Sequence, residues 1–331
     1  MSNDQYILAG NCLFVKGYSK NLLIDFQKNN WYHIDFDIPN KTDIDINELS
    51  DEIKKHLINE QMILKISTDL SGFFPQINLE FDTPAYIESV IIDRTKQSSY
   101  SLSKLVNWLD SLSTKLYQVR FFGEYRDSDI EEIILLTEKG ICESIDLILP
   151  YEKDLDTRFI QRIRKYPKIN SVTFYNCPLG IQLKTETNRL VYTKQNIGSS
   201  DCCGIVHPAF FVNTKQHILK SINYNSCLYK KLGIDTDGVI KNCPSMKESI
   251  GNLQNLNSVN IDSLETPQWF IKKDEIAVCQ DCEFRYICTD CRVKVVDGEN
   301  SRPSTCQYNP YTNKWKGDEE YSLPEDFKEK G

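Results

Sequence analysis

Short apolar runs rich in β-branched residues recur about every 27 residues through the middle of the chain. They occupy residues 90–92, 119–122, 145–149 and 172–175. Such runs, bounded by polar segments, are typical of strands that are buried in a sheet. The pattern therefore predicts four strands in this region.

Segments with helical periodicity separate these runs. They lie at residues 102–116, 130–139 and 155–165, the last with apolar residues at Leu155, Phe159 and Ile163. Strands that alternate with helices predict an α/β fold with a parallel sheet, either open and doubly wound or closed into a partial (βα) barrel. We expect this region to span residues 81–195.

The first 80 residues have a different pattern. Two apolar runs flank a polar turn at residues 17–21, and a helical segment follows at about residues 46–64. This order is similar to the winged-helix recognition element of enzymes that modify ribosomally made peptides, in which a leader peptide adds a strand to a sheet edge. A plain α+β accessory module is the alternative.

Composition narrows the function classes. The 331 residues carry a formal net charge of −8, with no cluster of Lys and Arg interleaved with aromatic residues, so nucleic acid is not an expected partner. No run approaches the ~20 apolar residues that span a bilayer, and the N-terminus lacks the charged start and apolar core of a secretory signal. We expect a cytoplasmic protein without membrane insertion. A Walker loop and a dinucleotide fingerprint are also absent from the sequence.

Cysteines are concentrated in the last third of the chain. Nine of the twelve fall between Cys202 and Cys306, which indicates a boundary near residue 190 and a C-terminal domain over residues 196–331. In a chain of this length without a secretory signal, such a cluster indicates metal or redox chemistry rather than disulfides.

The densest part of this region has the pattern CxxC, five residues, CxxC. Its cysteines are Cys279, Cys282, Cys288 and Cys291. Two thiolates three positions apart can bind one metal or adjacent irons of a cluster, because the turn between them directs both sulfurs to one side. The spacing is compatible with three interpretations: iron–sulfur clusters, structural zinc and metal-free thiols. It does not separate the first two, since iron and zinc both accept thiolates.

Upstream, a hairpin is expected between Cys227 and Cys243. Asp237 and Gly238 lie between two alternating runs, which favours a type I′ turn. Such a hairpin would bring the two cysteines into one neighbourhood.

Residues 220–315 resemble the SPASM domain, which follows the catalytic barrel in many peptide-modifying radical S-adenosylmethionine enzymes and holds auxiliary [4Fe–4S] clusters. The resemblance rests on the hairpin ending in Cys243 and Pro244, on the segment 250–253, and on the CxxC-x5-C element followed by Cys306. It implies two clusters.

The resemblance also implies their ligands. The first cluster would be held by Cys279, Cys282, Cys288 and Cys306, and the second by Cys227, Cys243 and Cys291. The second set lacks a fourth cysteine, which Cys202, Cys203 or His207 would supply unless one iron stays open. The last CxxC pair, separated by Thr289 and Asp290, is one residue shorter than the family's usual spacing.

The middle region departs from an active radical enzyme. In that family a CxxxCxxC loop follows the first strand of the barrel, whereas residues 93–99 contain no cysteine. The chain is therefore not expected to be an ordinary radical S-adenosylmethionine enzyme. Gly123 and Glu124, after the next strand, are similar to the family's cofactor-contacting Gly-Glu pair, and an ordinary strand exit is the alternative.

Taken over nearly its whole length, the chain resembles the SPASM-domain peptide maturase of grasp-with-spasm systems. In these systems such a protein accompanies an ATP-grasp ligase and a small precursor peptide. The resemblance implies a binding and scaffolding role in maturing a ribosomally synthesised peptide. A redox or Lewis-acid enzyme with an open iron, and a zinc-stabilised adaptor, are the alternatives.

Overall fold

The computed structural model describes residues 4–38, 41, 43–152, 159, 161, 163, 165–184 and 189–328. Contacts divide the chain into two compact units. Unit 1 comprises Met1–Phe81, Gly204–Ser226 and Phe270–Gly331, and unit 2 comprises Asp82–Cys203 and Cys227–Trp269. Residues expected in one C-terminal domain from 196 to 331 therefore contribute to both units.

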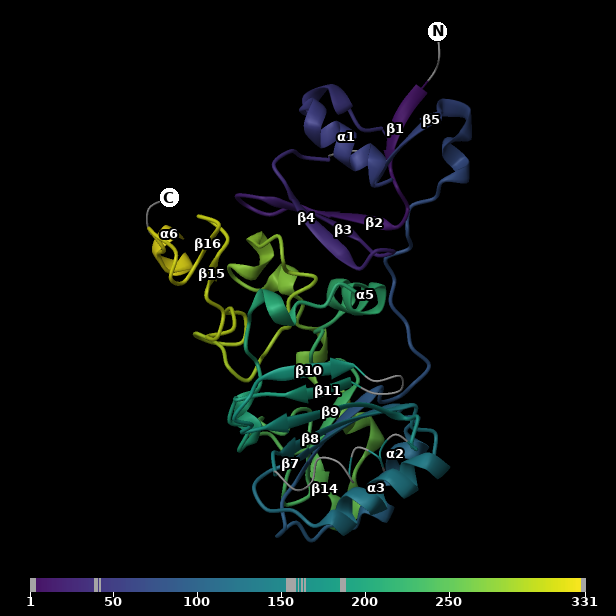
Figure 1. The fold of residues 1–331 in the computed structure, drawn as a ribbon, viewed down its shortest axis with the longest axis vertical. Coiled ribbons are helices and arrows are strands. Elements are labelled where there is room, and N and C mark those ends of the chain that lie inside the picture. The colour runs from purple at the N-terminus through teal and green to yellow at the C-terminus, as the bar shows by residue number, and fades with distance from the viewer. Residues whose placement is uncertain are drawn as a thin grey trace. The chain divides into compact units, whose positions relative to one another are not determined.

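Unit 2 is built on a nine-stranded sheet with the spatial order β10-β11-β9-β8-β7-β6-β12-β13-β14 (Figure 1). The strands are β6 (Ser89–Arg94), β7 (Leu116–Phe121), β8 (Ser144–Pro150), β9 (Ile169–Tyr175), β10 (Ile181–Lys184), β11 (Arg189–Tyr192), β12 (Lys231–Ile234), β13 (Val239–Lys241) and β14 (Gly251–Asn252). The strands from β11 across to β12 are parallel, and the outer pairs are antiparallel. The expected α/β class and the four expected strands, β6 to β9, are confirmed.

Helices α2 (Leu102–Ser111) and α3 (Asp127–Lys139) connect β6 to β7 and β7 to β8, and they contact each other. Strands β6 to β9 lie side by side in the sheet in the same order as in the sequence. Right-handed crossovers between them therefore place successive helices on one face of the sheet. The expected helix over 102–116 ends early, because Ser113 adopts a left-handed φ of 60°. Of the expected helix at 155–165, only alternate residues from Phe159 onward are described, and Phe159 and Ile163 are buried.

The two faces of this sheet differ in chemistry. Along β8 buried and half-buried residues alternate, with Ile145, Leu147 and Leu149 on the buried side. The opposite side, here called the polar face, includes Ser89, Gln118, Asp146 and Lys231, which help to line a cavity of about 380 Å³. Parallel strands usually bury apolar residues on both faces, so this sheet is unusual in having one face lined by polar side chains.

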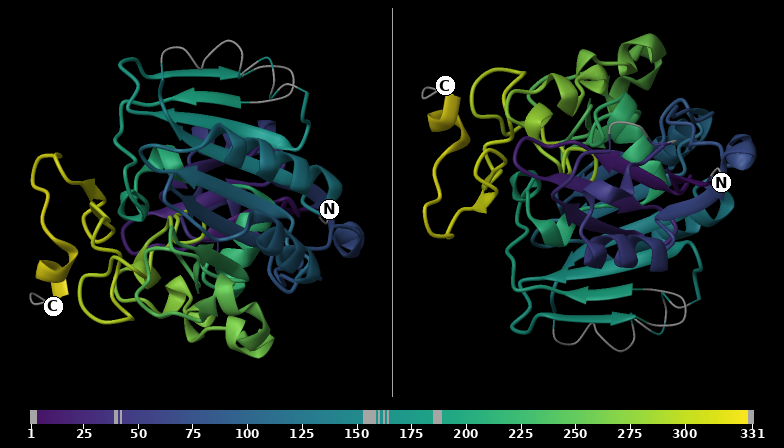
Figure 2. Two further views of the ribbon diagram at one scale, coloured as in Figure 1. Left: turned by 90° about the horizontal axis from the view of Figure 1, so that it is seen from below. Right: turned by 90° about the horizontal axis from the view of Figure 1, so that it is seen from above.

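Unit 1 is layered around a small antiparallel sheet of β2 (Cys12–Val15), β3 (Asn21–Asp25) and β4 (Asn30–Ile34). One face of this sheet packs against α1 (Asp51–Asn59) and the pair β1 (Asp4–Leu8) and β5 (Ile63–Ser67). The other face packs against α5 (Lys215–Asn223) and the cysteine-rich segment. Figure 1 shows β2 to β4 between α1 and α5, and the view from above in Figure 2 shows these strands together with α1.

The N-terminal module is therefore α+β with more strands than the sequence pattern predicts. Its helix α1 is capped by Ser50, whose side chain accepts a hydrogen bond from the Ile53 N–H. The likeness to a winged helix stays a prediction. The C-terminal part of unit 1 adds β15 (Tyr308–Asn309), β16 (Lys314–Trp315) and α6 (Pro324–Lys328). No helix within the described ranges is long and apolar enough to cross a membrane.

The hairpin between Cys227 and Cys243 is present as β12 and β13, but its turn is not of type I′. A type I′ turn needs a positive φ at both central residues, and of Asp237 and Gly238 only Gly238 has one, at 78°. The Asp235 carboxylate accepts hydrogen bonds from the Asp237 and Val239 N–H groups, at 3.0 and 2.9 Å. This side chain closes a longer loop over residues 236–238, so the predicted turn type is wrong.

Candidate metal centre

Four cysteines of unit 1 line one enclosed cavity of about 30 Å³. They are Cys279, Cys282, Cys288 and Cys306, the set implied for the first cluster. A 3-10 turn at Cys279–Asp281 brings the first pair together, with the Cys282 N–H bonded to the Cys279 carbonyl at 3.0 Å. The structure thus gathers all four residues of this predicted set.

The turn that carries Cys279 begins at an unusual backbone conformation. Val278 has a φ of 71°, in the left-handed region that β-branched residues rarely adopt. Such a conformation costs about 1–3 kcal/mol and persists only where the surrounding structure enforces it. Because Val278 also lines the cavity, the strain lies at the proposed site.

The sheet of the N-terminal module supports this site, which sequence patterns did not reveal. Phe284 and Ile287, between the two CxxC pairs, pack in one core with Leu13 and Val15 of β2. The backbone is joined as well, because the Tyr18 N–H donates to the Asp281 carbonyl at 2.8 Å. Residues almost 270 positions earlier in the chain therefore support the four cysteines that line this cavity. For example, Arg285 donates a hydrogen bond to the Lys16 carbonyl.

Burial makes the thiols of this cavity hard to ionise. It raises the pKa of Cys279, Cys282 and Cys306, and the neighbouring thiols raise each pKa further. Several thiolates this close together require a positive charge to offset their repulsion. A thiolate-binding metal group would supply that charge.

Lys273 is the buried cation beside this group. It is 4% exposed, and its Nζ donates to the Cys288 carbonyl at 2.7 Å. Burial lowers the pKa of Lys273, but Cys288, Asp290 and Cys279 raise it by more. The ammonium therefore stays charged and partly offsets the negative potential of the thiols.

The arrangement of the donors bears on which metal group fits. Within the part of the chain that the structure describes, no three His, Cys, Asp or Glu side chains are grouped so that they could hold a metal ion. In a zinc site four sulfurs lie ~2.3 Å from one ion, whereas each thiolate on a [4Fe–4S] cluster binds a different iron. Four thiols that line one cavity could bind either group through their sulfurs.

A second group of thiols lies in unit 2. Cys203 and Cys227 are each close enough to Cys243 to raise the pKa of its thiol. The Nζ of Lys231 lies 3.6 Å from the Cys227 Sγ. The hairpin thus brings Cys227 and Cys243 together as the sequence suggests, and adds Cys203.

Gly233 makes this second group possible. A Cβ at this position would lie 2.3 Å from the backbone nitrogen of Pro244 and 2.6 Å from the carbonyl carbon of Cys243. The chain leaving the hairpin therefore crosses directly over β12, where only glycine leaves enough room. This crossing places Cys243 beside Lys231.

We expect Gly233→Ala to displace Cys243 and to destabilise unit 2 by about 1–3 kcal/mol, because the added methyl group overlaps backbone atoms that have little freedom to move. Urea unfolding followed by circular dichroism measures the change. Gly72→Ala is the control for loss of a glycine, since no atom lies within 4 Å of its Cβ position and, like Gly233, it has no positive φ. A Gly233→Ala protein as stable as wild type would contradict the close crossing.

The remaining candidate ligands have different surroundings. Cys202 packs on an apolar cluster of Phe122, Tyr175 and Ile197, and burial raises its pKa. Cys291 is buried in unit 1, where a Cβ on Gly204 would approach its Sγ to 2.8 Å. In the same unit, the His207 side chain accepts a hydrogen bond from the Ala209 N–H at 3.2 Å and caps a short 3-10 helix.

A buried ion pair connects the second thiol group to the parallel strands. Arg120 of β7 donates to both carboxylate oxygens of Asp93 on β6, at 2.6 and 2.8 Å. The guanidinium of Arg120 is also close enough to Cys203 to lower the pKa of its thiol. Burial lowers the pKa of Arg120, but Asp93 raises it by more, so the guanidinium remains charged.

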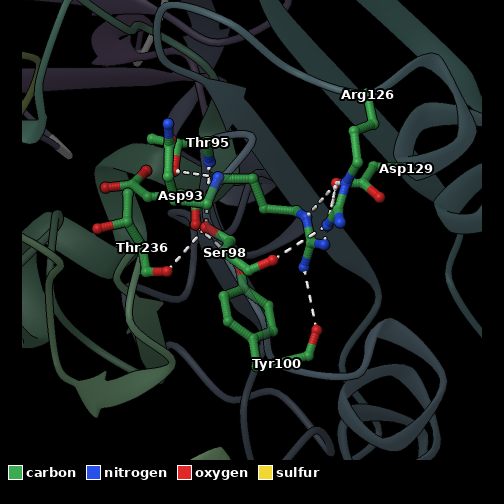
Figure 3. A network of polar contacts seen from close by, with 9 residues as sticks. Asp93, Thr95, Ser98, Tyr100, Arg126, Asp129 and Thr236 are labelled. Carbon is green, nitrogen blue, oxygen red and sulfur yellow. Dashed lines mark hydrogen bonds and ion pairs between the residues drawn. The ribbon is translucent and has the colours of Figure 1, made fainter.

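The loop after β6, where the radical enzymes carry CxxxCxxC, is held by a polar network (Figure 3). Ser98 donates to the Thr236 carbonyl at 2.7 Å, and Arg126 donates to the Ser98 carbonyl at 3.0 Å. Arg94 pairs with Asp129 at 2.9 Å. These contacts give the loop a structural role that depends on side-chain oxygens and guanidinium groups rather than on thiolates.

Gly123 and Glu124 lie at the exit of β7. Gly123 has a φ of 60°, and its N–H donates to the Tyr175 hydroxyl at 3.0 Å. The Glu124 carboxylate is 78% exposed and pairs with Lys96 at 2.9 Å, a hydrogen bond that lowers its pKa. A cofactor-contacting role for this pair stays a prediction.

These thiol groups and their cations are the features from which function can be argued. They are defined by the chain's own residues and geometry. No protein-family model, curated protein or solved structure matches the chain closely enough to assign it to a family.

Proposed function

We propose that this chain is an iron–sulfur protein that assists the maturation of a ribosomally synthesised peptide together with an ATP-grasp ligase. The observation that carries the iron–sulfur part is the enclosed cavity lined by Cys279, Cys282, Cys288 and Cys306. The peptide and ligase part is supported by the resemblance to grasp-with-spasm maturases.

These four cysteines would hold the first cluster through their sulfurs. When bound, the cluster supplies positive charge to four thiolates and a site for one-electron chemistry. Lys273 offsets the remaining negative charge from one side. Phe284 and Ile287 pack the other side against the N-terminal sheet and exclude water, so cluster binding and folding of unit 1 are coupled.

Two surfaces suit a peptide. β4 is an edge strand of the N-terminal sheet among the described residues, and an extended peptide can add to such an edge through backbone hydrogen bonds. The polar face of unit 2 offers Gln118, Asp146 and Lys231 around its cavity. We propose that precursor peptide binds at one of these surfaces.

The main alternative is an enzyme that uses an open iron at the second site. Its support is the missing fourth cysteine in the second ligand set. The proximity of Cys203 to Cys243 weakens this alternative, because it brings a further thiol to that site. A zinc-stabilised adaptor is the other alternative, because four thiols that line one cavity can also bind zinc.

The test is anaerobic purification of the full chain, followed by iron, acid-labile sulfide and zinc analysis with a visible absorption spectrum. Two [4Fe–4S] clusters would give about eight irons and eight sulfides per chain. Pull-down of the co-expressed ATP-grasp ligase and precursor peptide then tests the maturation role. A colourless protein with about two zinc ions would support the adaptor instead.

A further inference from the structure

We propose that the polar cavity of unit 2 binds a basic side chain, lysine or arginine, of the precursor peptide through the Asp146 carboxylate. This inference deepens the proposed function and rests on its peptide part, because it selects the polar face over the β4 edge and names the kind of residue bound there. It does not depend on iron. All residues that line the cavity belong to unit 2.

Neutral donors hold the Asp146 carboxylate in place. Its Oδ1 accepts a hydrogen bond from the Asn170 side chain at 2.9 Å and another from the Ser171 hydroxyl. An amide and a hydroxyl carry no charge. Among the residues that the structure describes, none bonds to Oδ2 or forms an ion pair with Asp146. The carboxylate is therefore positioned, and one of its oxygens remains available to a ligand.

A second carboxylate on the same face shows what Asp146 lacks. Asp93 and Arg120 are cross-strand neighbours, and the guanidinium donates to both carboxylate oxygens at 2.6 and 2.8 Å. The neighbour of Asp146 on β7 is Gln118, which is neutral. Asp146 is half-buried, and a charge that is partly removed from water is costly unless it is paired. A cation from outside the chain would supply the missing partner.

Lys231 of β12 also lines the cavity but does not serve as that partner. Its Nζ lies 3.6 Å from the Cys227 Sγ. Strands β6 and β7 lie between β12 and β8, so three strand spacings of ~4.8 Å, roughly 14 Å in all, separate Lys231 from Asp146. This exceeds the screening length of ~8 Å at physiological ionic strength. Lys231 therefore neither neutralises Asp146 nor strongly repels a cation bound there.

The other residues of the cavity suit a long basic side chain. Gln118 and Ser144 have neutral oxygens that can accept the remaining N–H donors of an ammonium or guanidinium group. Ile91 and Leu116 offer apolar contacts to a methylene stem. The volume of about 380 Å³ accommodates such a side chain with adjoining backbone. The net charge of −8 also favours approach of a cationic peptide.

The experiment measures the binding of model peptides to the full chain. The probes are acetylated and amidated alanine pentapeptides with lysine, arginine, norleucine or glutamate at the central position, and dissociation constants come from saturation-transfer NMR titrations. We expect the lysine and arginine peptides to bind at least about tenfold more tightly than the norleucine peptide, because the charge-assisted hydrogen bonds are lost in the latter. Equal binding of the lysine and norleucine peptides would overturn the inference.

Variants test whether Asp146 is responsible. Asp146→Asn keeps an acceptor oxygen for Asn170 and Ser171 but removes the charge, and it is expected to abolish the preference for lysine. Glu132→Gln is the matched control, because it removes an exposed carboxylate of α3 outside the cavity, and it should keep the preference. Asp146→Lys is expected to favour the glutamate peptide, which a purely structural role of Asp146 would not produce. A lysine preference that persists in Asp146→Asn would reject the assignment.

A cross-linking measurement on the wild-type protein covers the case in which the Asp146 variants do not fold. A carbodiimide joins a carboxylate to an amine that is in direct contact with it, and the sites joined to the lysine peptide are mapped by mass spectrometry. We expect Asp146 to be modified at least tenfold more than Glu132. Cross-links confined to other carboxylates would contradict binding at Asp146.

The outcomes separate this inference from the proposed function. A chain that captures the precursor and the ligase but shows no preference for lysine keeps the proposed function and rejects this inference. A preference that depends on Asp146, without capture of either partner, supports the site and rejects the maturation role. Binding of n-butylamine as tight as that of the lysine peptide would assign the cavity to small amines and reject a peptide residue.

Discussion

Replacement of Cys282 by serine is expected to release about four irons per chain and to lower the free energy of unfolding by more than about 4 kcal/mol. The reason is that the thiols of this site belong to the core of unit 1, where Cys282 packs with Phe284 and Tyr308 against the N-terminal sheet. Cluster binding to a site that exists only in the folded chain adds directly to stability. Iron analysis and anaerobic urea unfolding measure the two effects.

The matched control is Cys12→Ala. Cys12 is buried in the same unit, on the face of the N-terminal sheet that contacts α1 and β5. Burial raises its pKa to about 12, so it is a neutral thiol outside the candidate ligand set. This variant is expected to keep all iron and to lose only about 1–2 kcal/mol. An unchanged iron content in Cys282→Ser, or equal losses in the two variants, would reject the first cluster.

Replacement of Arg120 by methionine is expected to destabilise unit 2 by about 3–5 kcal/mol, because it leaves the Asp93 carboxylate buried without its partner. The side chains of Arg120 and Asp93 are 3% and 2% exposed, and solvent screening is therefore weak. The double variant Asp93→Leu with Arg120→Met removes both charges and is expected to recover most of the lost stability.

A double-mutant cycle based on urea unfolding measures this coupling. Lys115→Met is the control, because Lys115 pairs with Glu143 in an ion pair whose side chains are 45% and 61% exposed, and exposed pairs contribute about 0–1 kcal/mol. Additive effects of Asp93→Leu and Arg120→Met would contradict the buried pair. Iron content adds a second measurement, since Arg120→Met removes a buried cation near Cys203.

Local patterns account for the elements that the sequence predicted well. The strands β6 to β9 were expected because alternation of apolar, β-branched runs is visible within a few residues, and the hairpin because Asp237 and Gly238 mark a turn. The turn type was wrong because the Asp235 carboxylate closes a longer loop. The end of α2 was also misplaced, because the left-handed Ser113 carries no strong sequence mark.

The candidate site also has a part that local sequence patterns predict and a part that they do not. The CxxC spacing alone pairs Cys279 with Cys282 and Cys288 with Cys291, because it is a short-range property. The resemblance to the SPASM domain was needed to group Cys279, Cys282 and Cys288 with Cys306. The proximity of Cys203 to Cys243 is not visible in the sequence. It depends on the close crossing of the chain over Gly233, which brings together residues far apart along the chain.

The sequence by itself determined the α/β class, the parallel strands, the cysteine pairs and the absence of a CxxxCxxC loop. Only the tertiary structure decided that the cysteines of the cavity in unit 1 pack against the N-terminal sheet. It also decided that β12 pairs with β6, which lies some 140 residues earlier in the chain. The physical reason is that periodicity and spacing report which faces and turns a segment prefers. The partner that covers a buried face, or the cation that offsets a buried thiolate, is chosen by packing between distant segments.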